Sequence, residues 1–90
     1  MTISTFGEQE VQITSVYFRN NPGQQRLESY PRRMVVDGRE VNFIEQGMRY
    51  LVQKGQDFVK LFDVSDGQTQ YRLRLDASDH WTLVGMRAGV

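Results

Sequence analysis

Turn signals divide this chain into runs of similar length, and this spacing constrains the fold more than any other feature. The signals are Asn20–Gly23, Asp37–Gly38, Lys54–Gly55, Asp66–Gly67 and Asp76–Asp79. They recur at intervals of about ten residues, which is typical of an antiparallel sheet built from hairpins. The runs between them are rich in Val, Ile, Thr, Tyr and Phe, which suit a pleated, half-buried strand. We therefore predict an all-β fold: a small antiparallel meander of six to seven strands, closed or nearly closed into a barrel.

The chain has 90 residues, which is enough for one domain with one modest core. We expect a single small β domain over residues 1–90, with residues 1–8 as a loosely ordered N-terminal segment. The alternation of apolar residues along the runs predicts which side chains enter the core. The expected core residues are Val11, Ile13, Met34, Val36, Val41, Phe43, Tyr50, Val52, Val59, Leu61, Tyr71, Leu73 and Leu75.

Two segments give local predictions. The Asp37-Gly38 dipeptide predicts a two-residue hairpin turn, which sets Val36 opposite Arg39. In the run 44–53, Ile44, Met48 and Leu51 are spaced as on one helical face, but the glycine in the middle of the run disfavours a helix. We expect a strand interrupted by a turn or a bulge there.

The hairpin over residues 58–75 permits two registers. A two-residue turn at Asp66-Gly67 sets Phe62 opposite Tyr71 but leaves a lysine in the core row. A three-residue loop over Ser65–Gly67 sets Leu61 opposite Tyr71 instead and turns Phe62 outward. The second register gives the more uniformly apolar core row and is the favoured prediction.

In this favoured register, one outer sheet face combines aromatic rings and guanidinium groups. The next hairpin adds to it, because its simplest register sets Arg74 opposite Trp81. The predicted binding surface consists of Phe58, Phe62, Arg72, Arg74 and Trp81. Arginine and aromatic residues are enriched at protein interfaces, and aromatic rings beside cations also bind single-stranded nucleic acids.

Charge helps to rank the functional interpretations of this face. Eleven basic and eleven acidic residues give a net charge of zero, so no global field attracts nucleic acid or an anionic membrane. We predict a non-catalytic binding or assembly module that uses the face for protein–protein contact or self-association. The alternative is a small β-barrel that binds single-stranded nucleic acid. In a purely structural interpretation, the arginine stems cover the rings and their heads pair with nearby aspartates.

The apolar pattern of residues 58–64 bears on the same question. Apolar side chains fall on both faces of this run, so it is either central in a closed barrel or covered by a partner. A homodimer is one such arrangement, and it requires no excess of charge. We therefore expect a protein partner or a second copy of the chain.

Other classes of site lack the necessary residues. The chain has no cysteine and one histidine, His80, which excludes a thiolate or multi-histidine metal site. We assign no catalytic residue, no metal and no cofactor, and we expect that the protein is not an enzyme. No window is apolar enough for a membrane helix and no signal peptide precedes the first strand, so we predict a cytoplasmic protein without a membrane partner.

Overall fold

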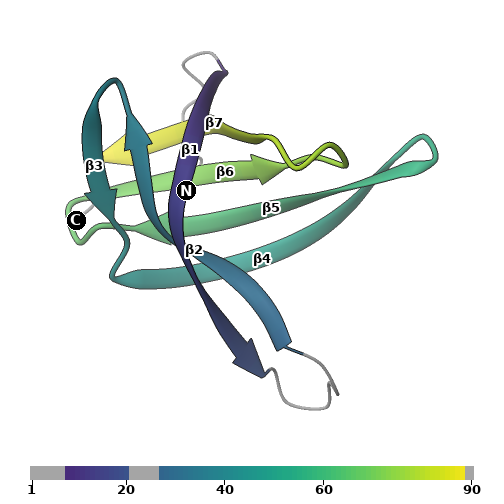
Figure 1. The fold of residues 1–90 in the computed structure, drawn as a ribbon, viewed down its shortest axis with the longest axis horizontal. Coiled ribbons are helices and arrows are strands. Elements are labelled where there is room, and N and C mark those ends of the chain that lie inside the picture. Colours follow the sequence, from purple (N-terminus) through teal and green to yellow (C-terminus); the bar gives the residue numbers. More distant parts are fainter. Residues whose placement is uncertain (1–7, 21–26, 89–90) are drawn as a thin grey trace.

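The computed structural model describes residues 8–20 and 27–88. They form seven strands: β1 (Gln9–Asn20), β2 (Leu27–Val36), β3 (Arg39–Asn42), β4 (Glu45–Lys54), β5 (Asp57–Ser65), β6 (Thr69–Leu75) and β7 (Trp81–Ala88). The strands pair antiparallel in the order β3-β2-β1-β7-β6-β5-β4 (Figure 1). The prediction of an all-β antiparallel meander is therefore confirmed. The expected loosely ordered segment 1–8 lies, apart from Glu8, outside the described residues.

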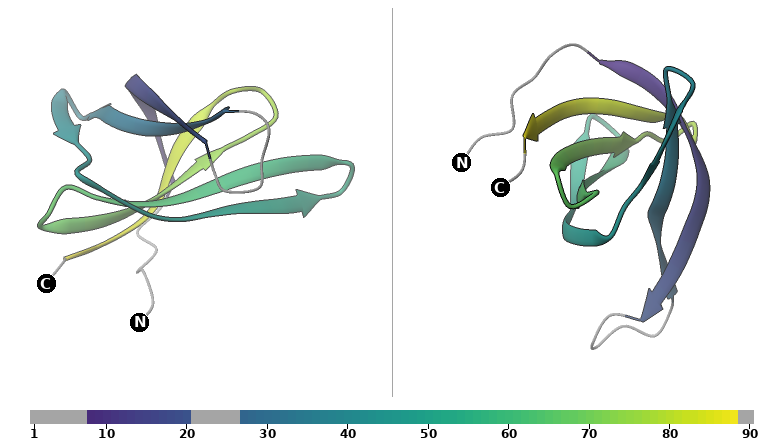
Figure 2. Two further views of the ribbon diagram at one scale, coloured as in Figure 1. Left: turned by 90° about the horizontal axis from the view of Figure 1, so that it is seen from below. Right: turned by 90° about the vertical axis from the view of Figure 1, so that its left-hand side faces the viewer.

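The sheet curls into a half-barrel, so closure is only partial. Pairing between β1 and β7 joins the first and the last strand, and the opening falls between β3 and β4 (Figure 2). Side chains bridge part of this opening from β4 to β2. Arg49 forms a 2.9 Å ion pair with Glu28, and the Gln46 amide donates to the main-chain oxygen of Pro31 at 3.0 Å.

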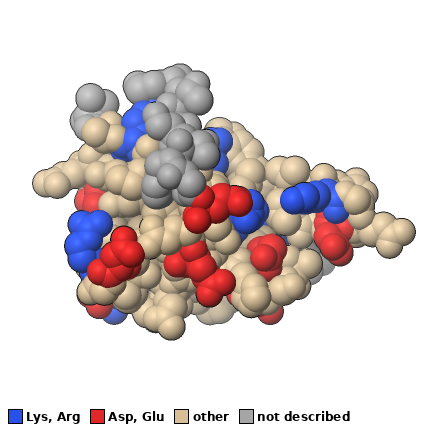
Figure 3. Space-filling view, turned by 90° about the horizontal axis from the view of Figure 1, so that it is seen from above, with Lys and Arg blue, Asp and Glu red and all other residues tan. Residues whose placement is uncertain are grey.

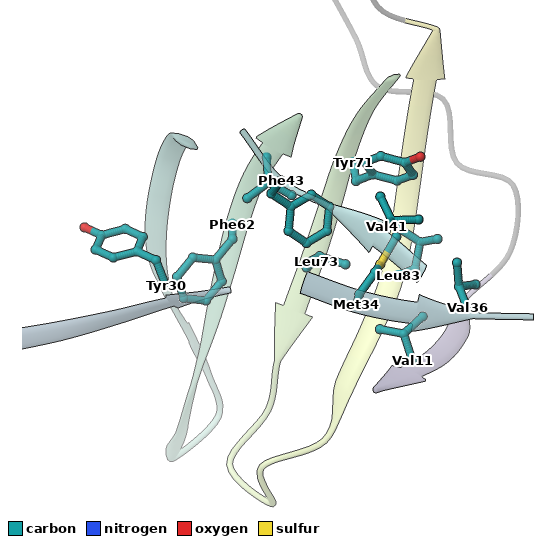
Figure 4. Close-up of a cluster of buried hydrophobic side chains, with 11 residues drawn as sticks. Val11, Tyr30, Met34, Val36, Val41, Phe43, Phe62, Tyr71, Leu73 and Leu83 are labelled. Carbon is teal, nitrogen blue, oxygen red and sulfur yellow. The ribbon is translucent and has the colours of Figure 1, made fainter. Parts of the chain in front are cut away.

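A single core fills the concave side of the sheet (Figure 4). Its buried members are Val11, Tyr30, Met34, Val36, Val41, Phe43, Phe62, Val64, Tyr71, Leu73 and Leu83, and Ile13, Tyr17, Leu75 and Trp81 pack against them. Aromatic contacts connect the layers: the Phe62 ring lies 5.9 Å from Tyr30 and 5.3 Å from Trp81, measured between centroids. The β1–β2 hairpin thus covers β5 at the position of Phe62.

The core prediction is right for the N-terminal half and for β6, and wrong for the β4–β5 hairpin. Four predicted residues, Tyr50, Val52, Val59 and Leu61, lie on the convex side, outside the core. The residues that β5 actually buries are Phe62 and Val64. Because adjacent residues of a strand point to opposite faces, choosing the wrong parity for β5 also misplaced its partner β4.

The local predictions for the β2–β3 turn and for the run 44–53 are confirmed. Val36 pairs with Arg39, and both turn residues have positive φ, 51° at Asp37 and 73° at Gly38, as a two-residue hairpin turn requires. The run 44–53 is a strand whose register shifts between Gln46 and Arg49. At this bulge the main chain of β4 approaches β5 closely, because a Cβ on Gly47 would lie 3.0 Å from the Asp63 carbonyl oxygen.

Candidate functional site

The structure does not bring the five predicted surface residues to one face. In the β5–β6 hairpin Phe62 pairs with Leu73 and Leu61 with Arg74, so both registers considered from the sequence are wrong. In the next hairpin Trp81 pairs with Leu75, one position away from the expected Arg74. Phe62 and Trp81 therefore face the core, and the two arginines face the convex side.

The register error comes from the length of the loop. The carboxylate of Asp66 accepts hydrogen bonds from the main-chain NH groups of Gln68 (2.8 Å) and Thr69 (2.7 Å), and the Asp66 NH donates to the Thr69 oxygen at 3.2 Å. Gly67 has a φ of 96°, which glycine adopts without strain. The resulting four-residue loop sets Ser65 opposite Gln70 and shifts every later pair.

On the convex side, Arg72 belongs to a compact polar cluster. Its guanidinium pairs with both oxygens of Asp63, at 2.8 and 3.1 Å, and lies 5.6 Å from the centroid of the Tyr50 ring. The Tyr50 hydroxyl donates to Asp63 at 3.1 Å, and this hydrogen bond is the main cause that raises the pKa of Tyr50. The hydrogen bond to Asp63 likewise raises the pKa of Arg72. Arg72 is thus engaged within the protein, as the purely structural interpretation expects.

Arg74 is also paired, with the carboxylate of Glu8. Acidic and basic side chains are interspersed over the face drawn in Figure 3, without a broad area of one sign. The single-strand platform would need unpaired cations beside exposed rings on one surface. The described residues form no such surface from Phe62, Trp81, Arg72 and Arg74.

A pocket of about 310 Å³ opens beside this cluster, at the bulge in β4. Its walls include Gly47, Met48, Arg72 and Arg87. The Arg87 guanidinium donates to the Gln70 side chain, while its Nε and Nη1 atoms are buried without a hydrogen-bond partner. In chemical terms, the pocket can accommodate a hydrogen-bond acceptor at Arg87.

Residues 8–20 and 27–88 contain no group of three or more His, Cys, Asp or Glu side chains that could hold a metal ion. The single histidine, His80, is exposed in the loop before β7, where its main-chain NH donates to Asp76 at 3.0 Å. The same residues contain no helix that is long and apolar enough to cross a membrane.

The end of the β4–β5 hairpin carries exposed apolar side chains, among them Phe58 of the predicted binding surface and Val52 of the predicted core. The last pair that β5 makes with β6 is Lys60 with Leu75, and Leu51 lies opposite Lys60, so within residues 51–59 all but Leu51 lie beyond this pair (Figure 1). We call these residues the arm. Leu51, Val52 and Phe58 of the arm are 60%, 41% and 52% exposed. A signal for it was present in the sequence, because residues 58–64 are apolar on both faces.

Comparisons with known proteins add no assignment. No protein-family model matches the chain, and no match is found among curated proteins or among solved structures.

Proposed function

We propose that this protein is a non-catalytic assembly module that self-associates through the arm. The observation that carries the proposal is the exposure of Leu51, Val52 and Phe58 on one projecting hairpin. Exposed apolar residues scattered singly are ordinary, but a cluster on one element is typical of an interaction site. The proposal keeps the function expected from the sequence, retains Phe58 and moves the rest of the surface from β5, β6 and β7 to the end of the β4–β5 hairpin.

Hydrophobic burial contributes to the driving force for weak association. Complete burial of a fully exposed Val, Leu or Phe side chain contributes about 1.5–3 kcal/mol, and the three apolar residues in each copy of the arm contribute less because they are already about half buried. Association costs at least about 4 kcal/mol in lost translational and rotational freedom. The surplus is modest, which favours an association that depends on protein concentration.

Charge does not oppose contact between copies. The formal net charge is zero, so two copies experience no overall electrostatic repulsion. The cysteine-free composition fits assembly in a reducing compartment such as the cytoplasm.

The test is sedimentation velocity over a wide concentration range, with one variant and one matched control. Leu51→Glu places a carboxylate in the proposed contact, where burial of an unpaired charge is costly. Phe18→Glu makes the same kind of change on the β1–β2 hairpin, at a residue that is 62% exposed compared with 60% for Leu51. We expect the wild type and Phe18→Glu to sediment faster as concentration rises and Leu51→Glu to remain monomeric. A wild type that stays monomeric at every concentration would refute the proposal.

A further inference from the structure

The arm has an open main-chain edge as well as exposed apolar side chains. Strand β4 is the last strand in the sheet order, and β5 occupies one of its two edges. Within the part of the chain that the structure describes, no strand pairs with its other edge. Side chains of Gln46 and Arg49 bridge from β4 to β2 at the base of this ten-residue strand, and the edge is open toward the hairpin end. An unpaired edge is a template for another strand, and natural proteins usually shorten or protect such edges.

The hairpin register determines which main-chain groups reach this open edge. Residues 55–56 form a two-residue turn between the paired residues Lys54 and Asp57, and such a turn closes on a pair that exchanges hydrogen bonds. Hydrogen-bonded and non-hydrogen-bonded pairs then alternate along the hairpin. The NH and C=O groups of Arg49, Leu51 and Gln53 are therefore directed away from β5, toward the open edge.

Symmetry restricts how two copies of β4 can pair. When a two-fold axis normal to the sheet relates two antiparallel strands, one residue lies opposite its own copy. The residues on either side of that central residue then pair with residues at the same distance from the centre in the second copy. A centre at Leu51 sets leucine against leucine, Val52 against Tyr50 of the second copy, and Arg49 against Gln53 of the second copy. No like charges then lie opposite each other, and all three outward-directed residues find hydrogen-bonded partners.

Neighbouring centres are less favourable. A centre at Tyr50 sets Arg49 against Leu51, so that a guanidinium faces the most exposed apolar residue of the arm. A centre at Val52 sets Leu51 against Gln53 and Tyr50 against Lys54. Opposed apolar pairs contribute more to sheet stability than such mixed pairs.

We infer that two copies of the chain pair through the open edges of β4, antiparallel and with the two-fold axis at Leu51, to form one continuous sheet across the dimer. This inference rests on the proposed self-association and specifies its geometry. The interface is isologous, so it closes at two copies and leaves no open β4 edge for further growth.

The absence of cysteine makes disulfide cross-linking a direct test of the register. Leu51→Cys should form a disulfide-linked dimer on oxidation, because directly opposed Cα atoms lie about 5.5 Å apart, within the disulfide range. Tyr50→Cys and Val52→Cys should each cross-link poorly alone, since their own copies lie diagonally at about 7–8 Å, but should cross-link to each other when mixed. Phe18→Cys is the control, and we expect Leu51→Cys to react on the order of tenfold faster.

A second measurement does not depend on substitutions. The amide protons of Leu51 and Gln53 should gain protection from hydrogen exchange as protein concentration rises. The amide of Val52, which is directed toward β5, should be protected at every concentration.

The possible results distinguish three failures: of the Leu51 register, of pairing through β4, and of self-association itself. Faster self-cross-linking of Tyr50→Cys or Val52→Cys than of Leu51→Cys would overturn the register. A wild-type dimer with neither arm cross-linking nor concentration-dependent protection in β4 would overturn β4 pairing and leave self-association intact. A strictly monomeric wild type would remove both.

Discussion

The two phenylalanines of β5 occupy the same face of one strand, four residues apart, in opposite environments. Phe62 is 1% exposed and Phe58 is 52% exposed. Phe62 lies where the β1–β2 hairpin crosses β5, against Tyr30 on one side and Trp81 on another. Phe58 lies in the arm, beyond the last pair with β6. The same side chain is therefore buried at one end of β5 and exposed at the other, because different elements pack against the two ends.

This comparison shows that burial here is supplied by distant elements. At the base of the hairpin, β2 provides the cover and the ion pair of Glu28 with Arg49 holds it against β4. The Arg49 guanidinium also lies 5.9 Å from the centroid of the Phe62 ring. The end of β6 and the loop after it line a pocket with Lys54, Asp57 and Val59 of the arm, but Leu51, Val52 and Phe58 remain exposed. In our proposal, the second copy pairs with the open edge of β4 and extends the sheet beside the arm.

The largest expected effect is the loss of Phe62. Phe62→Ala should lower the free energy of unfolding by about 3–5 kcal/mol, because it removes a buried ring and leaves a cavity. Phe58→Ala should change the stability of the monomer by no more than about 0.5 kcal/mol, as for other exposed sites. Urea unfolding at low protein concentration measures both. Similar losses for the two variants would show that the arm is covered within the monomer.

Glycines give a second contrast between the base and the arm. Gly47→Ala should cost about 1–3 kcal/mol, because the new methyl group would lie 3.0 Å from the Asp63 carbonyl oxygen and force β4 and β5 apart. Gly55→Asn should cost less than about 1 kcal/mol, since a Cβ there meets nothing within 4 Å and asparagine tolerates its φ of 63°. Thermal unfolding of both variants checks the order. A larger loss of stability for Gly55→Asn than for Gly47→Ala would contradict the view that the hairpin is tightly packed at Gly47 and open at the arm.

The smallest expected effect concerns the loop that closes β5 at its base. Burial raises the pKa of Asp66, but hydrogen bonds from the Gln68 and Thr69 NH groups and the Tyr71 hydroxyl outweigh burial and lower the pKa below its usual value. A lowered pKa means that the ionised carboxylate stabilises the fold above the unfolded-state pKa, and that this contribution disappears as pH falls through the folded-state pKa.

Asp66→Asn should therefore be less stable than the wild type at neutral pH, by less than about 1 kcal/mol because the loop is partly exposed. The difference should shrink as the pH falls through the folded-state pKa of Asp66. Urea titrations of both proteins over that range measure it. A difference that stays constant into strong acid would show that the charge of Asp66 does not stabilise the loop.

The predictions from the sequence are correct where a few neighbouring residues determine the structure. The Asp37-Gly38 turn sets its own register, because both residues accept positive φ and the flanking apolar residues match across two strands. The bulge in the run 44–53 follows from a glycine within a strand pattern. At Asp66 the same reasoning failed, because the side chain lengthens the loop by two residues relative to the dipeptide turn.

By itself, the sequence determined that this chain forms antiparallel strands joined by tight turns, since turn signals and β-branched runs act over a few residues. Only the tertiary structure decided which face of β5 enters the core. Both faces of residues 58–64 are apolar, so a period of two does not distinguish them. Contacts of Phe62 with Tyr30 and Trp81, 32 and 19 residues away along the chain, bury one face at the base of the hairpin. No local sequence pattern predicts these long-range contacts. For the same reason, no local pattern predicts that the apolar residues of the arm lack such contacts.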